Sequence, residues 1–292
     1  MLTLYNEFGK IEFGYKYNYR IREITGLEAV NKTFNVITYS DENGQETQSF
    51  VTGSRAITIA GTIKTSGNNL LEDLKRSMHR IIHHLPLTLE VHTHRVSRKI
   101  QVNQVVYEPK ETFGNLFAYF TLQLICDKPW FNDLNPTVID MSEYIDLITP
   151  TTGGIVELPA VWSTRGTSDM KIINSGDEIS RPKISMFAIR ALLDAPEGDT
   201  HITLRNDSTK QFITLENYKP APGETISVDT YERTVTSSIN GSIDKWLSDD
   251  SFLSDFWLQL GENVLSIENT NTDINLATQL EYENNYAEAT YK

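Results

Sequence analysis

Few side chains in this sequence have the types and spacing that catalysis or metal binding requires. His79 and His83 lie four residues apart on a predicted helix, a spacing that brings two imidazoles to one face. The HExxH arrangement of zinc enzymes is absent, and Lys75, Arg76 and Arg80 lie alongside, where they would repel a divalent cation. We therefore expect a structural or interface role for these histidines, and no metal site.

A cluster of carboxylates and aromatic rings follows residue 243. Such pairs occur in glycoside hydrolases and on carbohydrate-binding surfaces. The chain contains 39 Asp and Glu, however, so close pairs arise by chance, and their spacing does not match an EF-hand loop. We favour a solvated acidic loop around packed aromatic residues, with Trp246 as the candidate for stacking on a sugar, ahead of Trp257. The carboxylates are Asp244, Asp249, Asp250 and Asp255.

The remaining chemical signals indicate no enzyme. Cys126, the single cysteine, lies in an apolar predicted strand, where a thiol is buried and unreactive. The sequence contains no GxSxG, no GxxxxGK[ST], and no GxGxxG between a strand and a helix. We expect a protein without catalytic residues and without a cofactor.

Charge and composition exclude further classes. The chain has 292 residues and a net charge of −13, which disfavours a nucleic-acid binder because phosphate contacts need Lys and Arg. Residues 1–135 hold 15 Lys and Arg against 14 Asp and Glu, whereas 136–292 hold 11 against 25. No apolar run approaches the length of a membrane span, and we expect no signal peptide. One cysteine is compatible with folding in a reducing cytosol.

Alternating apolar residues predict strands through most of the first half. The predicted strands are Lys10–Tyr19, Phe34–Tyr39, Gln48–Val51, Ala56–Ile63, Leu87–His92, Lys99–Tyr107 and Leu116–Cys126, the last buried on both faces. Asn43-Gly44 within Asp41-Glu42-Asn43-Gly44 predicts a hairpin turn between two of them. We expect this hairpin tip to lie at an intermolecular contact.

One helix interrupts these strands. An apolar stripe predicts it over Asn69–Leu85, with Asn68 or Asn69 as the N-cap and Pro86 as its end.

The second half contains short strands at regular spacing, separated by Pro and Gly turns, which is typical of a β-sandwich. We expect strands near Met170–Asn174, Lys183–Phe187, His201–Arg205, Gln211–Leu215, Thr225–Asp229, Thr234–Ile239 and Asn263–Glu268, with a last one within Ala277–Tyr291. A Pro- and Gly-marked stretch separates the halves. The predicted organisation is a domain over 1–135, a linker over 136–159 and a second domain over 160–292, mainly β with one α-helix.

The order of these parts resembles the distal tail (Dit) family of long-tailed phages, also called siphovirus tail components. The features are a short first strand, paired strands ending in Ile59-Ala60-Gly61-Thr62-Ile63, the helix, and a closing strand with a Cys/Asp-Pro-aromatic signature in LQLICDKPWF. In the second half, IINSGDEISRPKISMFA, ISVDTYERTVT and SDFWLQLGENVLSIE are similar to the entry and later strands of the family's second domain.

The resemblance implies a structural role in a virion tail. Dit-like proteins form homohexameric rings through a tail-tube-like β-sandwich domain at the N-terminus, and they carry a galectin-like β-sandwich at the C-terminus. The ring joins the tail tube to a tail-associated hub or fibre protein at the tip or baseplate, and receptor-binding proteins attach to it. It is assembled in the host cytoplasm. The alternative that the residues leave open is a carbohydrate- or cell-surface-binding β-sandwich module.

Overall fold

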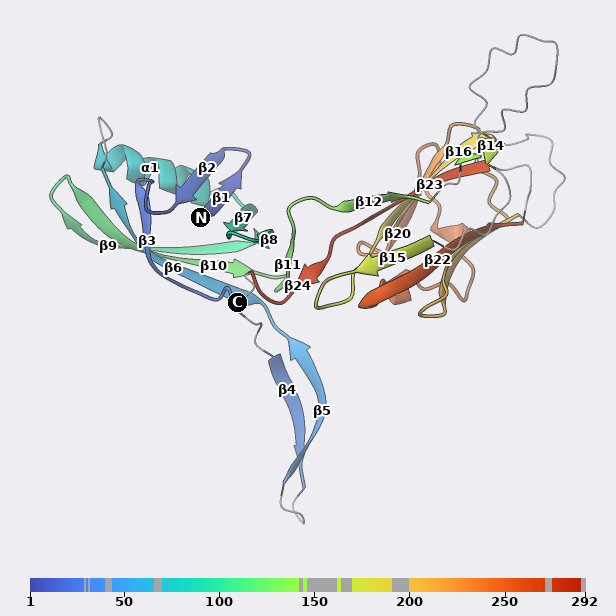
Figure 1. Cartoon of the computed structure of the whole chain (residues 1–292), viewed down its shortest axis with the longest axis horizontal. Helices are drawn as coiled ribbons and strands as arrows, with labels where there is room; N and C mark the ends of the chain where they lie inside the picture. Colours follow the sequence, from blue (N-terminus) through green and yellow to red (C-terminus); the bar gives the residue numbers. More distant parts are fainter. Residues whose placement is uncertain are drawn as a thin grey trace, which may run out of the picture. The chain divides into compact units, whose positions relative to one another are not determined.

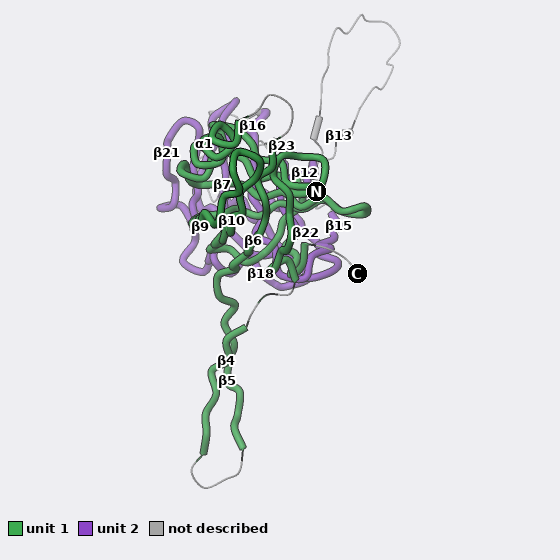
Figure 2. Tube along the Cα trace, turned by 90° about the vertical axis from the view of Figure 1, so that its left-hand side faces the viewer, with its two compact units in different colours: residues 1–134, 285–292 green, residues 135–284 purple. Residues whose placement is uncertain are grey.

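The protein folds into two compact units, residues 1–134 with 285–292 (unit 1) and residues 135–284 (unit 2), coloured separately in Figure 2. The computed structural model describes residues 1–28, 30, 32–39, 44–65, 70–141, 144–145, 162–163, 170–190, 200–270 and 275–289. Strands dominate this described part, and it contains one α-helix, which confirms the predicted fold class of mainly β with one helix.

Unit 1 is built on ten strands in the order β24-β11-β8-β7-β1-β2-β3-β6-β10-β9 (Figure 1). β2 and β3 share a single parallel pair, Phe13 with Tyr19, whereas the other neighbours pair antiparallel. The strands are β1 Leu2–Asn6, β2 Gly9–Phe13, β3 Tyr19–Thr25, β6 Arg55–Lys64, β7 Leu87–His92, β8 Ser97–Val102, β9 Gln104–Phe113, β10 Phe117–Cys126, β11 Phe131–Asp133 and β24 Asn285–Tyr286.

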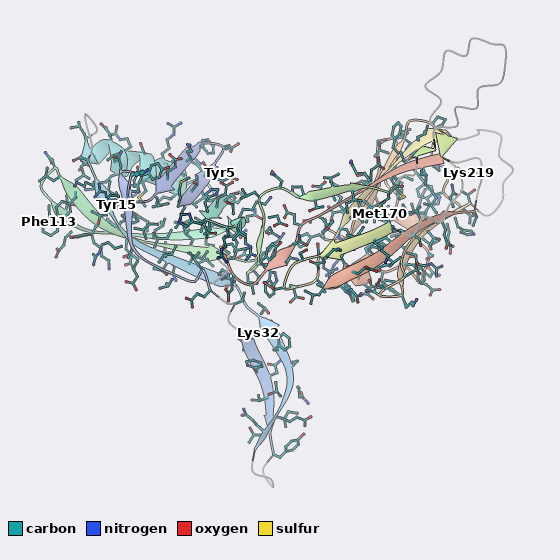
Figure 3. All side chains as sticks on the ribbon, in the orientation of Figure 1. Tyr5, Tyr15, Lys32, Phe113, Met170 and Lys219 are labelled. Carbon is teal, nitrogen blue, oxygen red and sulfur yellow. The ribbon has the colours of Figure 1, made fainter. Side chains whose placement is uncertain are left out.

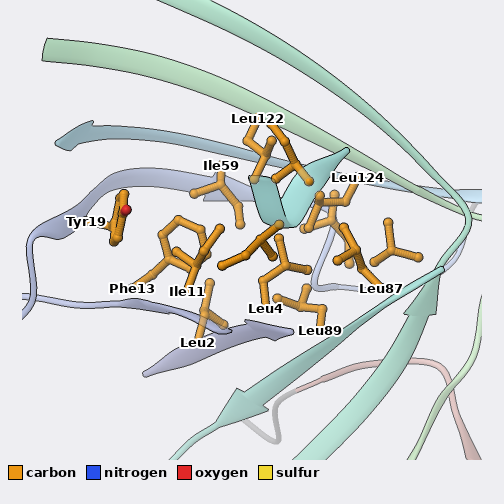
Figure 4. Close-up of a cluster of buried hydrophobic side chains, with 14 of the residues drawn as sticks. Leu2, Leu4, Ile11, Phe13, Tyr19, Ile59, Leu87, Leu89, Leu122 and Leu124 are labelled. Carbon is orange, nitrogen blue, oxygen red and sulfur yellow. The ribbon is translucent and has the colours of Figure 1, made fainter. Parts of the chain in front are cut away.

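The core of unit 1 lies between the strands at the two ends of this order, with β1, β2, β7 and β8 on one side and β6 and β10 on the other. Figure 4 shows Leu4 and Phe13, from β1 and β2, in one cluster with Ile59 and Leu122, from β6 and β10. All four side chains are fully buried. β10 has one face in this core, while its other face is half-buried rather than covered as expected, because Tyr119 and its alternate neighbours face away from the core.

The helix α1 (Leu71–Ile82) closes the core of unit 1 with an apolar stripe that includes Leu74 and Met78. Its predicted N-cap residues lie outside the described part of the chain, and Leu70 occupies the N-cap without a side-chain cap bond. The helix ends before the predicted Leu85. The amide of the Asn6 side chain donates to the carbonyl oxygens of Ile81 at 3.1 Å and His84 at 2.7 Å, which satisfies acceptors that the helix end leaves open.

Two predicted strands are each divided in the structure. Lys10–Tyr19 breaks after Phe13, because a turn at Gly14 brings the Gly14 N–H to the Tyr19 carbonyl at 2.9 Å. Lys99–Tyr107 breaks at Asn103, between β8 and β9. β8 lies between β11 and β7, whereas β9 is the edge strand beside β10 at the other end of the order. The alternation of side chains does not reveal this break.

Unit 2 is a β-sandwich of a six-stranded sheet, β12-β23-β16-β19-β20-β21, and a four-stranded sheet, β15-β22-β17-β18. One core cluster contains buried residues of both sheets, among them Ile184 and Leu204. The strands are β12 Thr137–Asp140, β15 Met170–Asn174, β16 Lys183–Arg190, β17 His201–Asn206, β18 Gln211–Glu216, β19 Thr225–Asp229, β20 Thr234–Ser237, β21 Gly241–Ser242, β22 Gly261–Asn269 and β23 Asn275–Tyr282.

Short elements complete the fold. In unit 2, β13 (Tyr144–Ile145) pairs with β14 (Trp162–Ser163), and two 3₁₀ turns cover Asp244–Trp246 and Leu253–Asp255. In unit 1, β4 (Lys32–Thr38) and β5 (Gln45–Thr52) form a separate two-stranded sheet.

The chain crosses between the units twice. The expected linker of 136–159 begins inside unit 2, because β12 pairs with β23 there, and most of its remaining residues lie outside the described part. The expected second domain of 160–292 likewise extends too far, since β24 pairs with β11 and returns residues 285–292 to unit 1. Both boundaries between the units are set by strand pairing between segments that are distant in sequence, and the composition of the chain does not indicate such pairing.

Candidate assembly surfaces

The hairpin β4–β5 is the most exposed element of unit 1. It extends away from the ten strands, and both Figure 1 and Figure 2 show it projecting alone. Its strands pair antiparallel from Lys32–Thr52 to Thr38–Gln45, with a register shift after Asn35. Nearly every residue along both strands is exposed. The hairpin therefore has two side-chain faces that the rest of its unit leaves uncovered.

Apolar side chains occupy the stem of this hairpin. Phe34 and Phe50 are opposite each other, with ring centroids 6.3 Å apart, and they are 56% and 55% exposed. Val51 is 60% exposed. The Lys32 ammonium lies 4.5 Å from the centroid of the Phe50 ring, and Figure 3 shows Lys32 at the base of the hairpin. The stem thus presents an aromatic pair to its surroundings.

The predicted interface residues at the tip are only partly described. Asp41, Glu42 and Asn43 lie outside the described residues. Gly44 is described and has φ of 133°, a conformation that glycine adopts without a side-chain penalty. The expectation that the tip lies at an intermolecular contact stays a prediction. The sequence pattern indicates the turn but not the exposed aromatic pair on the stem, because a strand pattern does not show whether another layer covers Phe34 and Phe50.

A second aromatic cluster lies where β9 turns into β10. The rings of Phe113 and Phe117 stack with centroids 4.9 Å apart, and Tyr119 meets both edge-on. Phe113 is 45% exposed, and Leu116 in the turn is 68% exposed. Strand periodicity does not distinguish these residues, because it assigns them to a sheet without indicating which end of the sheet is exposed.

The basic face of α1 is exposed as the helical pattern predicts, and the imidazoles on it and directly after its end contact other rings. His79 meets Tyr107 edge-on at 4.8 Å, and Phe8 stacks on His84 at 4.0 Å. His83 meets His84 edge-on at 5.5 Å. Over the whole described part of the chain, no group of three or more His, Cys, Asp or Glu is placed to hold a metal ion.

Trp246, the candidate for sugar stacking, is half-buried against the core of unit 2. The Lys245 ammonium lies 3.9 Å from the centroid of its ring, and Tyr218 meets the ring at 5.0 Å, close to perpendicular. The Tyr218 hydroxyl in turn donates to the Glu224 carboxylate. Trp246 is thus integrated into a packed cluster, and sugar stacking by this ring stays a prediction.

Glu224 is a buried carboxylate that accepts hydrogen bonds from three groups of unit 2. It accepts hydrogen bonds from Tyr218, from the Ser237 hydroxyl and, at 2.6 Å, from the Ala221 N–H. Burial by itself would raise the pKa of Glu224, but these hydrogen bonds outweigh it and the pKa lies below its ordinary value. The group therefore remains a carboxylate that holds the 218–224 segment to β20.

The other chemical candidates also have structural surroundings. Asp244 accepts from the Val235 N–H at 3.1 Å and from the Ser242 hydroxyl at 2.8 Å. Cys126 is fully buried, and desolvation raises the pKa of its thiol to about 12 despite the nearby Arg55. Within the described residues, no helix has the length and apolarity needed to cross a membrane.

Comparison with known proteins shows similarity to phage tail proteins in one part of the sequence and in the fold. No curated protein matches the sequence. The family model for the C-terminal domain of the siphovirus-type tail component matches residues 188–286. The fold is similar to the Dit protein of phage SPP1, described as a paradigm of the hub adsorption apparatus in phages that infect Gram-positive bacteria. That match has a TM-score of 0.65 and 13% identity, and it covers 98% of this chain and 99% of that chain.

A second similar structure comes from the phage P2 baseplate in its activated conformation with Ca. It has a TM-score of 0.51 and 11% identity, with 97% of each chain covered. At these identities the two structures establish a shared fold, while the family model assigns most of the sandwich of unit 2. Both lines agree with the resemblance drawn from the order of strands and helix: residues 188–286 match the C-terminal domain of the siphovirus-type tail component, and the chain shares its fold with these two phage proteins.

Proposed function

We propose that this protein forms a homohexameric ring through unit 1, and that the ring joins the tail tube to the hub or fibre protein at the tail tip. Unit 2 then offers a surface for receptor-binding or side-fibre proteins. The role is structural rather than catalytic, and the protein is located at the distal end of the virion tail after assembly in the host cytoplasm.

The exposed hairpin β4–β5 carries this proposal. An isolated two-stranded hairpin is marginally stable in water, and it becomes ordered when something covers it. Its strand edges and the apolar side chains of Phe34, Phe50 and Val51 are the kind of surface that pairs with another chain. Within a closed ring, the neighbouring copy supplies that cover at every position, which is the property of a cyclic, head-to-tail interface.

Charge supports unit 1 as the ring-forming part. Residues 1–135 have a net charge of +1, whereas 136–292 have −14. Six copies of a near-neutral surface can approach without strong mutual repulsion, while six strongly acidic surfaces repel one another unless they stay apart. The balance therefore favours contact through unit 1 and a solvent-facing position for unit 2.

The test is the mass of the full chain by native mass spectrometry across the micromolar range. The wild-type chain is expected as a hexamer. The double variant Phe34→Ser/Phe50→Ser is expected to shift the population to monomer, while circular dichroism shows that the chain stays folded. Phe252→Ser is the matched control, because Phe252 is 59% exposed but belongs to unit 2.

A strictly monomeric wild-type chain would refute the ring. A double variant that stays hexameric would remove the hairpin stem from the interface, leaving the Phe113–Phe117 cluster as the alternative contact.

A further inference from the structure

The last described residues of the chain behave as a strand added to unit 1. β24 pairs with β11 through Phe131–Tyr286 and Asn132–Asn285, and Figure 1 shows the two strands side by side. The Asn132 side-chain amide also donates to the side-chain oxygen of Asn285 at 2.9 Å. Residues 285–289, called the terminal segment below, follow the whole of unit 2 in sequence.

A buried arginine binds the main chain of this segment. Arg55, at the start of β6, is 4% exposed. Its Nη2 donates to the carbonyl oxygen of Ala287 at 2.5 Å. Its other donors go to the carbonyl oxygens of Pro129 at 2.6 Å, Gly26 at 2.8 Å and Glu28 at 2.6 Å. One guanidinium thus joins two other segments of unit 1, around residues 26–28 and at Pro129, to the terminal segment.

A second buried arginine binds the next peptide group. Arg98 on β8 is 2% exposed, and its Nη1 donates to the carbonyl oxygen of Glu288. Its guanidinium carbon lies 3.7 Å from the centroid of the Tyr286 ring, and that of Arg55 lies 4.8 Å from the centroid of the Phe131 ring. The paired residues of β11 and β24 therefore each place a ring against one of the two cations.

The terminal segment also fills part of the core. Tyr286 is 7% exposed and Ala289 is fully buried, and both belong to the hydrophobic cluster of unit 1. The Ala289 N–H donates to the carbonyl oxygen of Leu27 at 3.0 Å. The segment is therefore held at both ends of its course by main-chain hydrogen bonds and between them by the two arginines.

We propose that unit 1 carries a peptide-binding groove, formed by β8, β11, Arg55 and Arg98, whose ligand is the terminal segment of this same chain. The groove binds an extended peptide by its carbonyl oxygens and by one aromatic side chain, and unit 1 is complete only when that peptide is in place.

The buried charges give the physical reason. Without the terminal segment, Arg55 loses the Ala287 acceptor while it keeps its three acceptors within the rest of unit 1, and Arg98 loses the Glu288 acceptor and the Tyr286 ring. Hydrogen bonds from a charged donor contribute more than those between neutral groups, so both of these carbonyl acceptors favour the bound segment. Because most of these contacts use main-chain atoms, binding depends on an extended backbone and on Tyr286 more than on the other side chains, as in strand addition.

The test has one arm on the full chain and one on a chain that ends at Asn284. In the full chain, hydrogen exchange is expected to be slow over residues 286–289, and Arg98→Ala is expected to speed it at least about tenfold. The shortened chain is expected to bind a fluorescein-labelled peptide of residues 283–292, one peptide per chain, while the full chain does not. The Tyr286→Ala peptide is expected to bind at least about tenfold more weakly. Arg205→Ala, an exposed arginine of unit 2, is the control and changes neither readout.

Two results would overturn the proposal. One is exchange over residues 286–289 in the full chain at the rate of the free peptide. The other is a shortened chain that folds normally but does not bind the peptide. If the shortened chain precipitates, slow exchange that depends on Arg98 in the full chain supports the groove, and fast exchange refutes it. Neither readout involves the number of copies in the assembly, so a failure here is distinguishable from a failure of the proposed ring.

Discussion

Gly61 is the position where adding one methyl group is expected to damage unit 1 most clearly. It lies in the middle of β6, opposite Phe120 on β10. A Cβ at this position would come within 2.5 Å of the Phe120 Cζ and 2.6 Å of the Arg20 carbonyl oxygen. The ring can shift, but the carbonyl belongs to the neighbouring strand β3, so relief requires the sheet itself to move.

The magnitude follows from the cost of overpacking a core. Extra atoms in a well-packed site typically cost about 1–3 kcal/mol. The lower unfolded-state entropy of alanine offsets about 0.4–1 kcal/mol of this. We expect Gly61→Ala to destabilise unit 1 by about 2 kcal/mol, because one of the two close atoms is main chain. In a unit of this size that lowers the melting temperature by about 4–8 °C.

Scanning calorimetry of the full chain is the appropriate assay, because two units need not unfold together. Gly53→Ala is the control, since a Cβ there meets nothing within 4 Å. The double variant Gly61→Ala/Phe120→Leu is expected to recover part of the loss by removing the ring contact, but not the contact with the Arg20 oxygen. If Gly61→Ala melts within about 1 °C of the control, the close approach of β3 and β10 does not constrain this position and the reasoning is refuted.

Two further predictions concern the buried ionisable groups. The pKa of Glu224 lies below its ordinary value of 4.5, so its contribution to the stability of unit 2 is present above that pH and is lost as the pH falls through the lower, folded value. Glu224→Gln should abolish this part of the pH dependence in thermal melts and lower stability at pH 7 by about 1–3 kcal/mol, whereas the exposed Glu216→Gln should do neither. Cys126, with a pKa of about 12, should be inert to a thiol reagent at pH 8 until unit 1 unfolds, and rapid labelling of the native chain would show that the strand opens locally.

Short-range patterns predicted most of the elements in this chain. The alternation of apolar and polar residues predicted β15, β19 and β7 at their observed limits. Each of these strands has one face in a core, so every second side chain is apolar. The helical spacing of apolar residues predicted α1, and the Asn43-Gly44 turn predicted the pairing of β4 with β5. The order of these elements along the sequence also carries the resemblance to the Dit family, with which the shared fold agrees.

Contacts between residues distant in sequence decided what those patterns left open. No local signal in Asn285–Tyr286 indicates that this strand pairs with β11, more than 150 residues earlier, instead of extending the sandwich that precedes it. Arg55 and Arg98 look like ordinary surface cations in sequence, since the carbonyl oxygens that bind them come from other segments. Likewise, Phe34 and Phe50 resemble core residues of a strand pair, and only the tertiary structure leaves their hairpin without a layer to cover it. Periodicity shows which side chains form an apolar face. The tertiary structure determines whether that face is covered by the same chain or is left for another chain.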